Sequence, residues 1–191
     1  MPADNFLFRK ENQLRKSDKS IRQKWDKQIL GLCNKLNQSP NYYTTSSCSG
    51  RVVLLIDSDE KQKDLFIKVW HDKITFKQLK NQLKNISSDK LIYFKQDPCI
   101  LHVCTNSLKN AQKIHDLAKE SGWKRCGIIA SKKRFIVELN ATAKLEFPIY
   151  NKKIMVDDNF LKFLIKETNK KLEHSWNCIK KLEETLADSL S

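Results

Sequence analysis

The sequence is poor in glycine, with only four in 191 residues. They stand apart, at positions 31, 50, 122 and 127, so it contains neither a G-x-G-x-x-G fingerprint nor a P-loop. A Rossmann-type dinucleotide cradle and a nucleoside triphosphatase are therefore excluded. No apolar run approaches the ~18 residues of a membrane helix, and the N-terminus lacks a signal-peptide pattern. We therefore expect a soluble, cytoplasmic protein.

The sequence has six cysteines, and no two of them form a C-x-x-C pair. Cys99, His102 and Cys104 are close in sequence, but on a strand His102 and Cys104 would share a face while Cys99 points away. That spacing does not suit a zinc site. We therefore expect structural thiols, no metal and no disulfide framework.

Positive charge is abundant and unevenly distributed. The chain has 36 basic and 22 acidic residues, a formal net charge of +14. Positions 1–36 carry nine basic and four acidic residues, and positions 109–134 carry eight and two. Concentrated positive charge favours a polyanionic partner, so these two segments predict contact with nucleic acid.

The first third of the chain predicts a helix, a polar loop and a pair of strands. Apolar residues recur at helical spacing up to Pro40, at Ile21, Trp25, Ile29, Leu32 and Leu36. Strands are expected at 51–56 and 65–70, separated by a charged turn. Thr75 is placed to cap a short helix that reaches about residue 86.

The remaining two thirds predict strands, a central helix and a long C-terminal helix. The expected strands are 91–94, 99–104, 126–130, 134–139 and 144–149. A helix over 108–121 would end at Gly122, and another runs from Asp158 to the end of the chain. Hairpins outnumber crossovers, so we expect one domain over 1–191, of α+β type. Its mixed, largely antiparallel sheet is covered by helices, with long helices at both termini.

The most informative segment is Thr-Thr-Ser-Ser-Cys-Ser-Gly-Arg, at positions 44–51. Five hydroxyls and one thiol fill positions 44–49, and each hydroxyl needs a partner if it is buried. Gly50 allows close approach of the backbone, and Arg51 offers a planar fork of donors for a carboxylate or phosphate. The segment is also compatible with a plain polar turn before the strand.

This segment strongly resembles the signature of the wybutosine-synthesising protein 3 family, with no substitution. Two other segments are similar to elements of that family. Residues 98–103, Pro-Cys-Ile-Leu-His-Val, match one element with Cys99 in place of an aromatic residue. Residues 122–128 match a second, with Trp123 and Cys126 as departures. The resemblance extends over about residues 14–182.

The resemblance implies an S-adenosylmethionine-dependent tRNA methyltransferase. Its expected substrate is the tricyclic wyosine-type base beside the anticodon of phenylalanine tRNA, methylated at nitrogen-4 during wybutosine-derivative synthesis. Removing a proton from a ring nitrogen requires a general base with a pKa near neutrality. Among the family-like residues His102 and His71 are the candidates, with Ser47 as a further catalytic residue. Either histidine could instead be a hydrogen-bonded structural residue.

Binding residues are expected around the same segment and in the basic region near residue 124. The expected cofactor-binding residues are Thr45, Ser46, Ser49, Gly50 and Asp26, although Asp26 could equally serve in a salt bridge. The expected RNA-binding residues are Arg51, Tyr42, Tyr43, Lys124 and Arg125, with the tyrosines as stacking surfaces and the cations as phosphate contacts.

Two other functions remain open at this point. One is a non-catalytic, basic tRNA-binding module whose hydroxyl-rich segment holds phosphate. The other is a thiol enzyme that uses Cys48 with Arg51 nearby. The sequence does not decide between a monomer and a homodimer.

Overall fold

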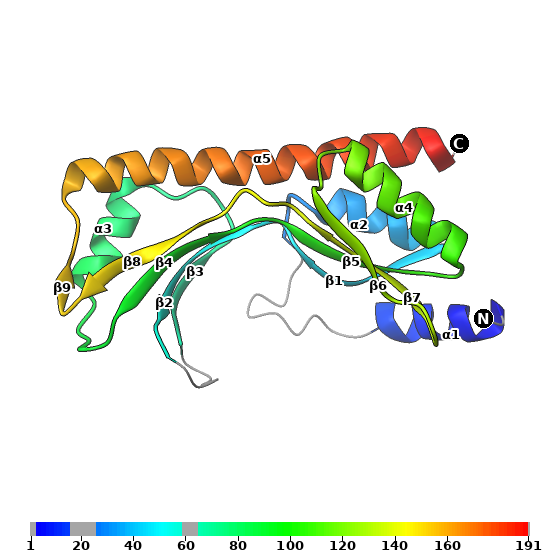
Figure 1. The fold of residues 1–191 in the computed structure, drawn as a ribbon, viewed down its shortest axis with the longest axis horizontal. Helices are drawn as coiled ribbons and strands as arrows, with labels where there is room; N and C mark the ends of the chain where they lie inside the picture. Colours follow the sequence, from blue (N-terminus) through cyan, green and yellow to red (C-terminus); the bar gives the residue numbers. More distant parts are fainter. Residues whose placement is uncertain (1–2, 16–25, 59–64, 191) are drawn as a thin grey trace. The chain divides into compact units, whose positions relative to one another are not determined.

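The computed structural model describes residues 3–15, 26–58 and 65–190, and Figure 1 shows their helices and strands. The chain divides into two compact units. Unit 1 comprises Met1–Ser49, Cys99–Thr142 and Ser175–Ser191, and unit 2 comprises Gly50–Pro98 and Ala143–His174. Because the chain passes between them after residues 49, 98, 142 and 174, neither unit is a continuous stretch of sequence. The single domain over 1–191 stays a prediction.

Unit 1 contains a four-stranded antiparallel sheet in the order β1-β5-β7-β6. Its strands are β1 (Tyr42–Cys48), β5 (Ile100–Thr105), β7 (Phe135–Asn140) and β6 (Arg125–Ala130). The helices α2 (Leu30–Gln38), α4 (Leu108–Glu120) and the C-terminal part of α5 (Asp158–Leu190) contribute to its main core. Leu101, Val137 and Trp123 are completely buried there, so this face of the sheet is apolar.

The other face of this sheet carries α1 (Ala3–Leu14) at one end. Phe6 of α1 packs its ring 5.3 Å from that of Tyr43, in a small cluster with Cys104 and Ile136. A helix as short as α1 is only marginally stable alone in water. Burial of these apolar side chains against the sheet supplies the additional stability.

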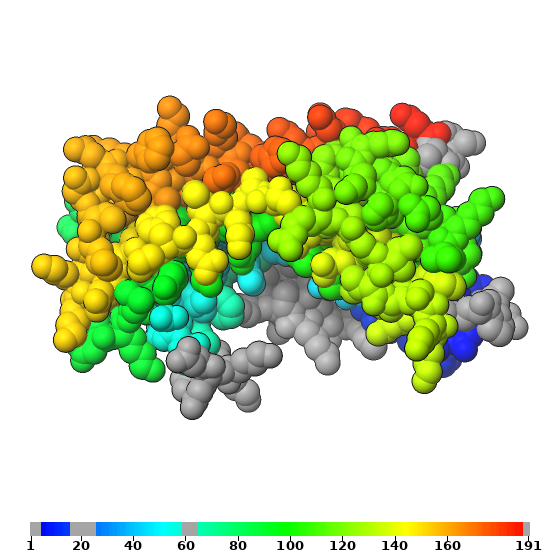
Figure 2. Space-filling view, in the orientation of Figure 1, coloured from blue at the N-terminus to red at the C-terminus, as the bar shows by residue number. Residues whose placement is uncertain are grey.

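Unit 2 contains a five-stranded antiparallel sheet in the order β3-β2-β4-β8-β9. Its strands are β3 (Phe66–Trp70), β2 (Arg51–Ile56), β4 (Ile92–Asp97), β8 (Leu145–Asn151) and β9 (Lys153–Ile154). Helix α3 (Phe76–Lys84) and the first part of α5 lie on one side of the sheet (Figure 1). The outer side of α5 remains at the surface (Figure 2, orange to red).

The two faces of the unit 2 sheet differ in polarity because side chains alternate along each strand. Val52, Leu54 and Phe94 are fully buried on one face. The opposite face presents Arg51 and Asp97 as cross-strand partners. Val53 on that same face is only 1% exposed, so the polar pair lies next to an apolar, buried part of the face.

The predicted α+β class, the antiparallel pairing and the long C-terminal helix are confirmed. Thr75 caps α3 through a capping box with Gln78, and Gly122 follows α4 with a φ of 94°. The strands form two sheets where one was predicted. Ile21 and Trp25, from the predicted N-terminal helix, lie outside the described residues. No helix in the described part of the chain is long and apolar enough to cross a membrane.

Candidate active site

The hydroxyl-rich segment forms strand β1, so the prediction of a polar loop at 44–49 is wrong for most of its length. The strand pairs antiparallel with β5, and its register shifts between Thr44 and Ser46. Pairing with a central strand satisfies backbone groups that a loop would leave to water. The hydroxyls therefore point to alternating faces of a sheet instead of converging on one pocket.

Thr44 and Ser49 use their polar groups inside unit 1. Asn37 Nδ2 donates to Thr44 Oγ1 at 3.1 Å, and the Thr44 amide donates to Asn37 Oδ1 at 2.8 Å. The amide and hydroxyl of the fully buried Ser49 donate to Asp26 Oδ2, at 2.9 and 3.2 Å. Asp26 thus joins the chain before α2 to the end of β1.

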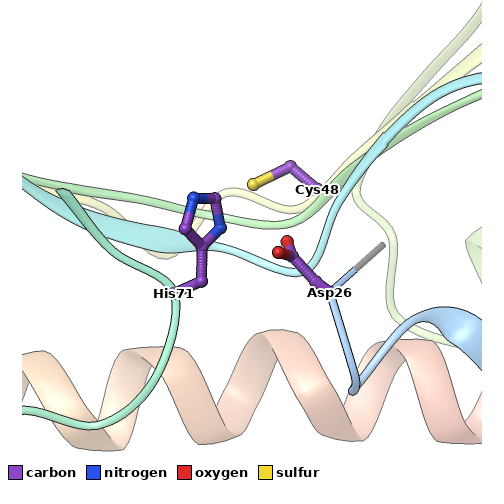
Figure 3. A group of neighbouring side chains, drawn as sticks. All are labelled: Asp26, Cys48 and His71. Carbon is purple, nitrogen blue, oxygen red and sulfur yellow. The ribbon is translucent and has the colours of Figure 1, made fainter. Parts of the chain in front are cut away.

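Figure 3 labels Asp26 and Cys48, both of unit 1, and also His71, which belongs to unit 2. Asp26 is 9% exposed and Cys48 is half-buried. His71 follows directly after β3 and is half-buried. Gly50, where the chain enters unit 2, has a φ of 103°, a conformation that favours glycine.

Ser46 and Ser47 face opposite sides of the unit 1 sheet. Ser46 is exposed and stands directly opposite His102 on β5. Ser47 hydrogen-bonds the thiol of Cys33, a fully buried residue of α2. Burial raises the pKa of the Cys33 thiol to about 12, so the contact is between two neutral groups at neutral pH. Ser46, and not Ser47, therefore shares the face of His102.

His102 is paired with a carboxylate. Its Nε2 lies 2.8 Å from Glu138 Oε2, and the two residues are direct cross-strand partners on β5 and β7. Thr45 Oγ1 donates to the carbonyl of His102 at 3.5 Å. A carboxylate on one ring nitrogen orients the imidazole and leaves Nδ1 to exchange a proton with a substrate. The next strand places Gly127 opposite Glu138, and no atom lies within 4 Å of where a Cβ would be.

The predicted RNA contacts divide into exposed and buried residues. Lys124 and Arg125 are exposed before and at the start of β6. Tyr42 and Tyr43 are only 1% and 3% exposed. Tyr42 belongs to the main core, and Tyr43 packs against Phe6. Their rings are therefore not accessible for stacking on an RNA base, in contrast to the prediction from the sequence. Their aromatic surface stabilises unit 1.

Arg51 lies in unit 2 and is held by an acidic residue. Its Nε donates to Asp97 Oδ2 at 2.9 Å, and its Cζ lies 5.5 Å from the centre of the Phe66 ring. Sequence reasoning missed both Asp97 and Glu138 as partners of site residues. Each acid lies near the end of a strand or alternates with apolar residues, but only the strand register shows which basic residue it faces.

A histidine paired with a glutamate, beside one exposed hydroxyl on a basic α+β protein, is a candidate site for a transfer reaction with general acid–base catalysis. The model of the family described as Methyltransferase TYW3 matches residues 8–188. The chain belongs to this family, as its signature segment predicted, and it is accordingly a methyltransferase that requires a methyl donor.

Relatives and solved structures agree with this assignment. A protein of Methanocaldococcus jannaschii, named tRNA(Phe) 7-((3-amino-3-carboxypropyl)-4-demethylwyosine(37)-N(4))-methyltransferase, is 36% identical over 89% of this chain and 91% of its own. The tRNA wybutosine-synthesizing protein 3 homolog of Xenopus laevis is 31% identical over 97% and 76%. A structure of the PH1069 protein from Pyrococcus horikoshii superposes with a TM-score of 0.88 at 27% identity, covering 99% of this chain and 97% of that one.

Proposed function

We propose that this protein methylates nitrogen-4 of 7-(3-amino-3-carboxypropyl)-4-demethylwyosine at position 37 of tRNA(Phe), with S-adenosylmethionine as the donor. The observation that carries the proposal is the 36% identity to the archaeal enzyme of that name across 91% of its length. The hydroxyl-rich strand β1 and the His102–Glu138 pair supply the polar groups that such a reaction requires.

The donor set of the described residues fits S-adenosylmethionine. The group carries ribose hydroxyls, an ammonium and a carboxylate. Each unit, taken by itself, offers groups of the required kind. In unit 1, Asp26 is a buried acid suited to hydroxyl donors and Ser46 offers an exposed hydroxyl. In unit 2, Arg51 offers charged N–H donors for a carboxylate. When bound, S-adenosylmethionine supplies a methyl group on a positively charged sulfur, which is an electrophile.

The residues of unit 1 would serve as base and orienting partner. His102 would accept the proton that nitrogen-4 of the base loses when it is methylated. Glu138 keeps the imidazole in place and stabilises its positive charge after it accepts the proton. Alignment of nitrogen and methyl carbon contributes much of the rate, because it converts a bimolecular encounter into an intramolecular one.

The RNA backbone would be held by positive charge. Lys124 and Arg125 are exposed, and the whole chain carries a net charge of +14. Phosphate contacts of this kind position a nucleic acid without reading its sequence. Recognition of the tricyclic base itself requires further polar groups, and those near His102 would contact its reacting nitrogen.

The test is transfer of labelled methyl from S-adenosylmethionine to tRNA(Phe) that lacks this methyl group, with mass spectrometry of nucleoside 37. We expect a gain of one methyl mass on the tricyclic base. His102→Ala should lower the rate by about 10²–10⁴. The matched control is His115→Ala, because His115 also faces a carboxylate at 2.8 Å, that of Asp116, but on α4.

The failed outcomes are informative in different ways. Tight tRNA binding with no methyl transfer would favour the non-catalytic RNA-binding module. Methyl transfer to another nucleoside would retain the enzyme and reject its substrate. Equal losses in His102→Ala and His115→Ala would remove His102 from the mechanism.

A further inference from the structure

Strands β2 and β4 of the unit 2 sheet carry an ion pair of defined geometry. Arg51 and Asp97 are direct cross-strand partners on β2 and β4, joined by a 2.9 Å hydrogen bond from Arg51 Nε to Asp97 Oδ2. Both side chains are 37% exposed. The Phe66 ring, itself 44% exposed, covers part of the guanidinium at 5.5 Å. The pair is thus held in place while remaining accessible to solvent.

Several hydrogen-bonding positions of this pair remain available. The contact between the two side chains uses only Arg51 Nε and Asp97 Oδ2. Within the described part of the chain, no hydrogen bond involves the two Nη atoms of Arg51 or Oδ1 of Asp97. The backbone beneath is fixed, because Gln96 Nε2 donates to the Asp97 carbonyl at 2.9 Å. A cation with free N–H donors therefore lies beside an anion with a free oxygen, where the neighbouring strands β2 and β4 begin and end.

This arrangement complements a zwitterionic α-amino acid. A carboxylate pairs with guanidinium N–H groups in a planar, charge-assisted contact, and an ammonium donates to a carboxylate oxygen. The cation and the anion of the pair lie at fixed positions. The pair should therefore bind a ligand that carries both a carboxylate and an ammonium more tightly than a ligand that carries only one of them.

We propose that Arg51 and Asp97 form the subsite for a 3-amino-3-carboxypropyl group. This inference rests on the proposed function, in which two molecules carry that group: the tricyclic base of the tRNA and S-adenosylmethionine through its methionine portion. Arg51 takes the carboxylate, Asp97 takes the ammonium, and Phe66 holds the guanidinium plane in position.

The decisive variant exchanges the two residues, Arg51→Asp with Asp97→Arg. This variant retains a cross-strand ion pair, so its thermal unfolding midpoint should be unchanged. The positions of the positive and negative charges that face the ligand are reversed. The matched control exchanges another cross-strand pair of the same sheet, Lys95→Glu with Glu146→Lys, whose Nζ and Oε1 lie 2.5 Å apart. Should the exchange variant not fold, Arg51→Gln with Asp97→Asn removes both charges at similar size.

The first experiment measures binding by calorimetry, with S-adenosylhomocysteine and with 5′-methylthioadenosine, which lacks the amino acid portion. If the subsite holds the donor, the exchange variant loses about 10- to 100-fold in affinity for S-adenosylhomocysteine and nothing for methylthioadenosine. The control variant binds both ligands as the wild type does.

The second experiment compares kcat/KM on tRNA(Phe) whose tricyclic base carries or lacks the 3-amino-3-carboxypropyl chain. If the subsite holds the base, the exchange variant loses the preference of the wild type for the complete chain by about 10- to 100-fold. A variant that keeps both the cofactor affinity and the RNA preference within about twofold overturns the proposal. If the wild type methylates neither RNA, the proposed function fails, and the calorimetric result alone decides the subsite.

Discussion

Individual polar residues of this protein differ in whether their partners are already supplied by the fold. Thr44 and Ser49 are hydrogen-bonded inside unit 1, to Asn37 and Asp26. Ser46 is exposed beside His102. Loss of a buried partner leaves an unsatisfied polar group, whereas loss of an exposed hydroxyl costs little stability. Substitutions at 44 and 49 should therefore act on folding, and those at 46 on substrate.

Glu138→Gln should lower kcat by about tenfold or more and leave the thermal unfolding midpoint unchanged. The amide fills the same space, but it does not stabilise a positive charge on His102. The pH profile of kcat distinguishes a positioning role from a structural one, because only the former changes the profile. Asp116→Asn, beside His115, is the matched control. Unchanged kcat and profile in Glu138→Gln would contradict this role.

Buried thiols should make the protein less stable at alkaline pH. Burial raises the pKa of Cys33 from 9.0 to about 12, and burial also raises the pKa of Cys99. The folded state then holds protons that the unfolded state releases above about pH 9. Stability is fully present below that pH and decreases by up to ~1.4 kcal/mol per unit for Cys33 as pH rises toward 12.

Denaturant unfolding under reducing conditions between about pH 8 and pH 11 measures this slope. Cys33→Ala removes one of the thiols, so its free energy of unfolding should decrease less steeply over this range than that of the wild type. Parallel curves for the two proteins would show that Cys33 ionises equally in the folded and unfolded states.

Secondary-structure elements are stabilised at their ends by identifiable residues. Helix α3 begins with a complete capping box: the Gln78 amide donates to Thr75 Oγ1 at 3.2 Å, and the Thr75 amide donates to Gln78 Oε1 at 2.8 Å. Helix α4 has Ser107 as its N-cap, with Oγ accepting from the Asn110 backbone amide, and Gly122 lies just beyond its C-terminal end. These contacts satisfy backbone groups that a helix otherwise leaves without partners at its ends.

Thr75→Ala should lower the free energy of unfolding by about 1 kcal/mol, because it removes the acceptor for an N-terminal amide of α3. Chemical denaturation provides the measurement. Thr185→Ala is the control, since Thr185 Oγ1 donates to the Lys181 carbonyl within α5 and caps no helix. An equal effect of the two substitutions would rule out capping as the cause.

Gly122→Ala should destabilise the protein by about 1–2 kcal/mol. Its φ of 94° disfavours a Cβ, and that Cβ would meet Cys178 Sγ at 3.3 Å. Gly127→Ala is the matched control, because its backbone is ordinary and nothing lies within 4 Å of the added atom. Similar unfolding midpoints for the two variants would show that the backbone at 122 relaxes without cost.

On the scale of the whole molecule, the excess of positive charge should govern association with tRNA. The net charge of the chain is +14. When basic side chains contact the phosphates of tRNA, counterions are released from the RNA, so the affinity of the protein for tRNA falls as the salt concentration rises. We expect at least a tenfold loss of tRNA affinity between about 50 and 200 mM salt, measured by filter binding. Lys124→Gln with Arg125→Gln should reduce the slope, whereas Lys180→Gln, on α5, should not. A slope near zero would exclude phosphate contacts.

Much of the element order was predictable, because it depends on local pattern. Thr75 was correctly predicted as a helix cap, and Gly122 as the residue at which a helix ends. The sequence predicts a loop at 44–49, because the hydroxyl-bearing residues there do not show the alternation of apolar and polar residues that is typical of a strand. Most of this segment nevertheless forms β1. Register with β5 decided its structure, and register is a long-range property.

The sequence by itself determined the family, the α+β class and the basic character, since each follows from residue identity and short-range spacing. Only the tertiary structure decided that Ser46 and not Ser47 faces His102, that Tyr42 is buried, and that His102 and Arg51 have the acidic partners Glu138 and Asp97. The physical reason is sequence distance. These partners lie 36 and 46 positions apart in the chain, and only strand pairing brings them within hydrogen-bonding distance.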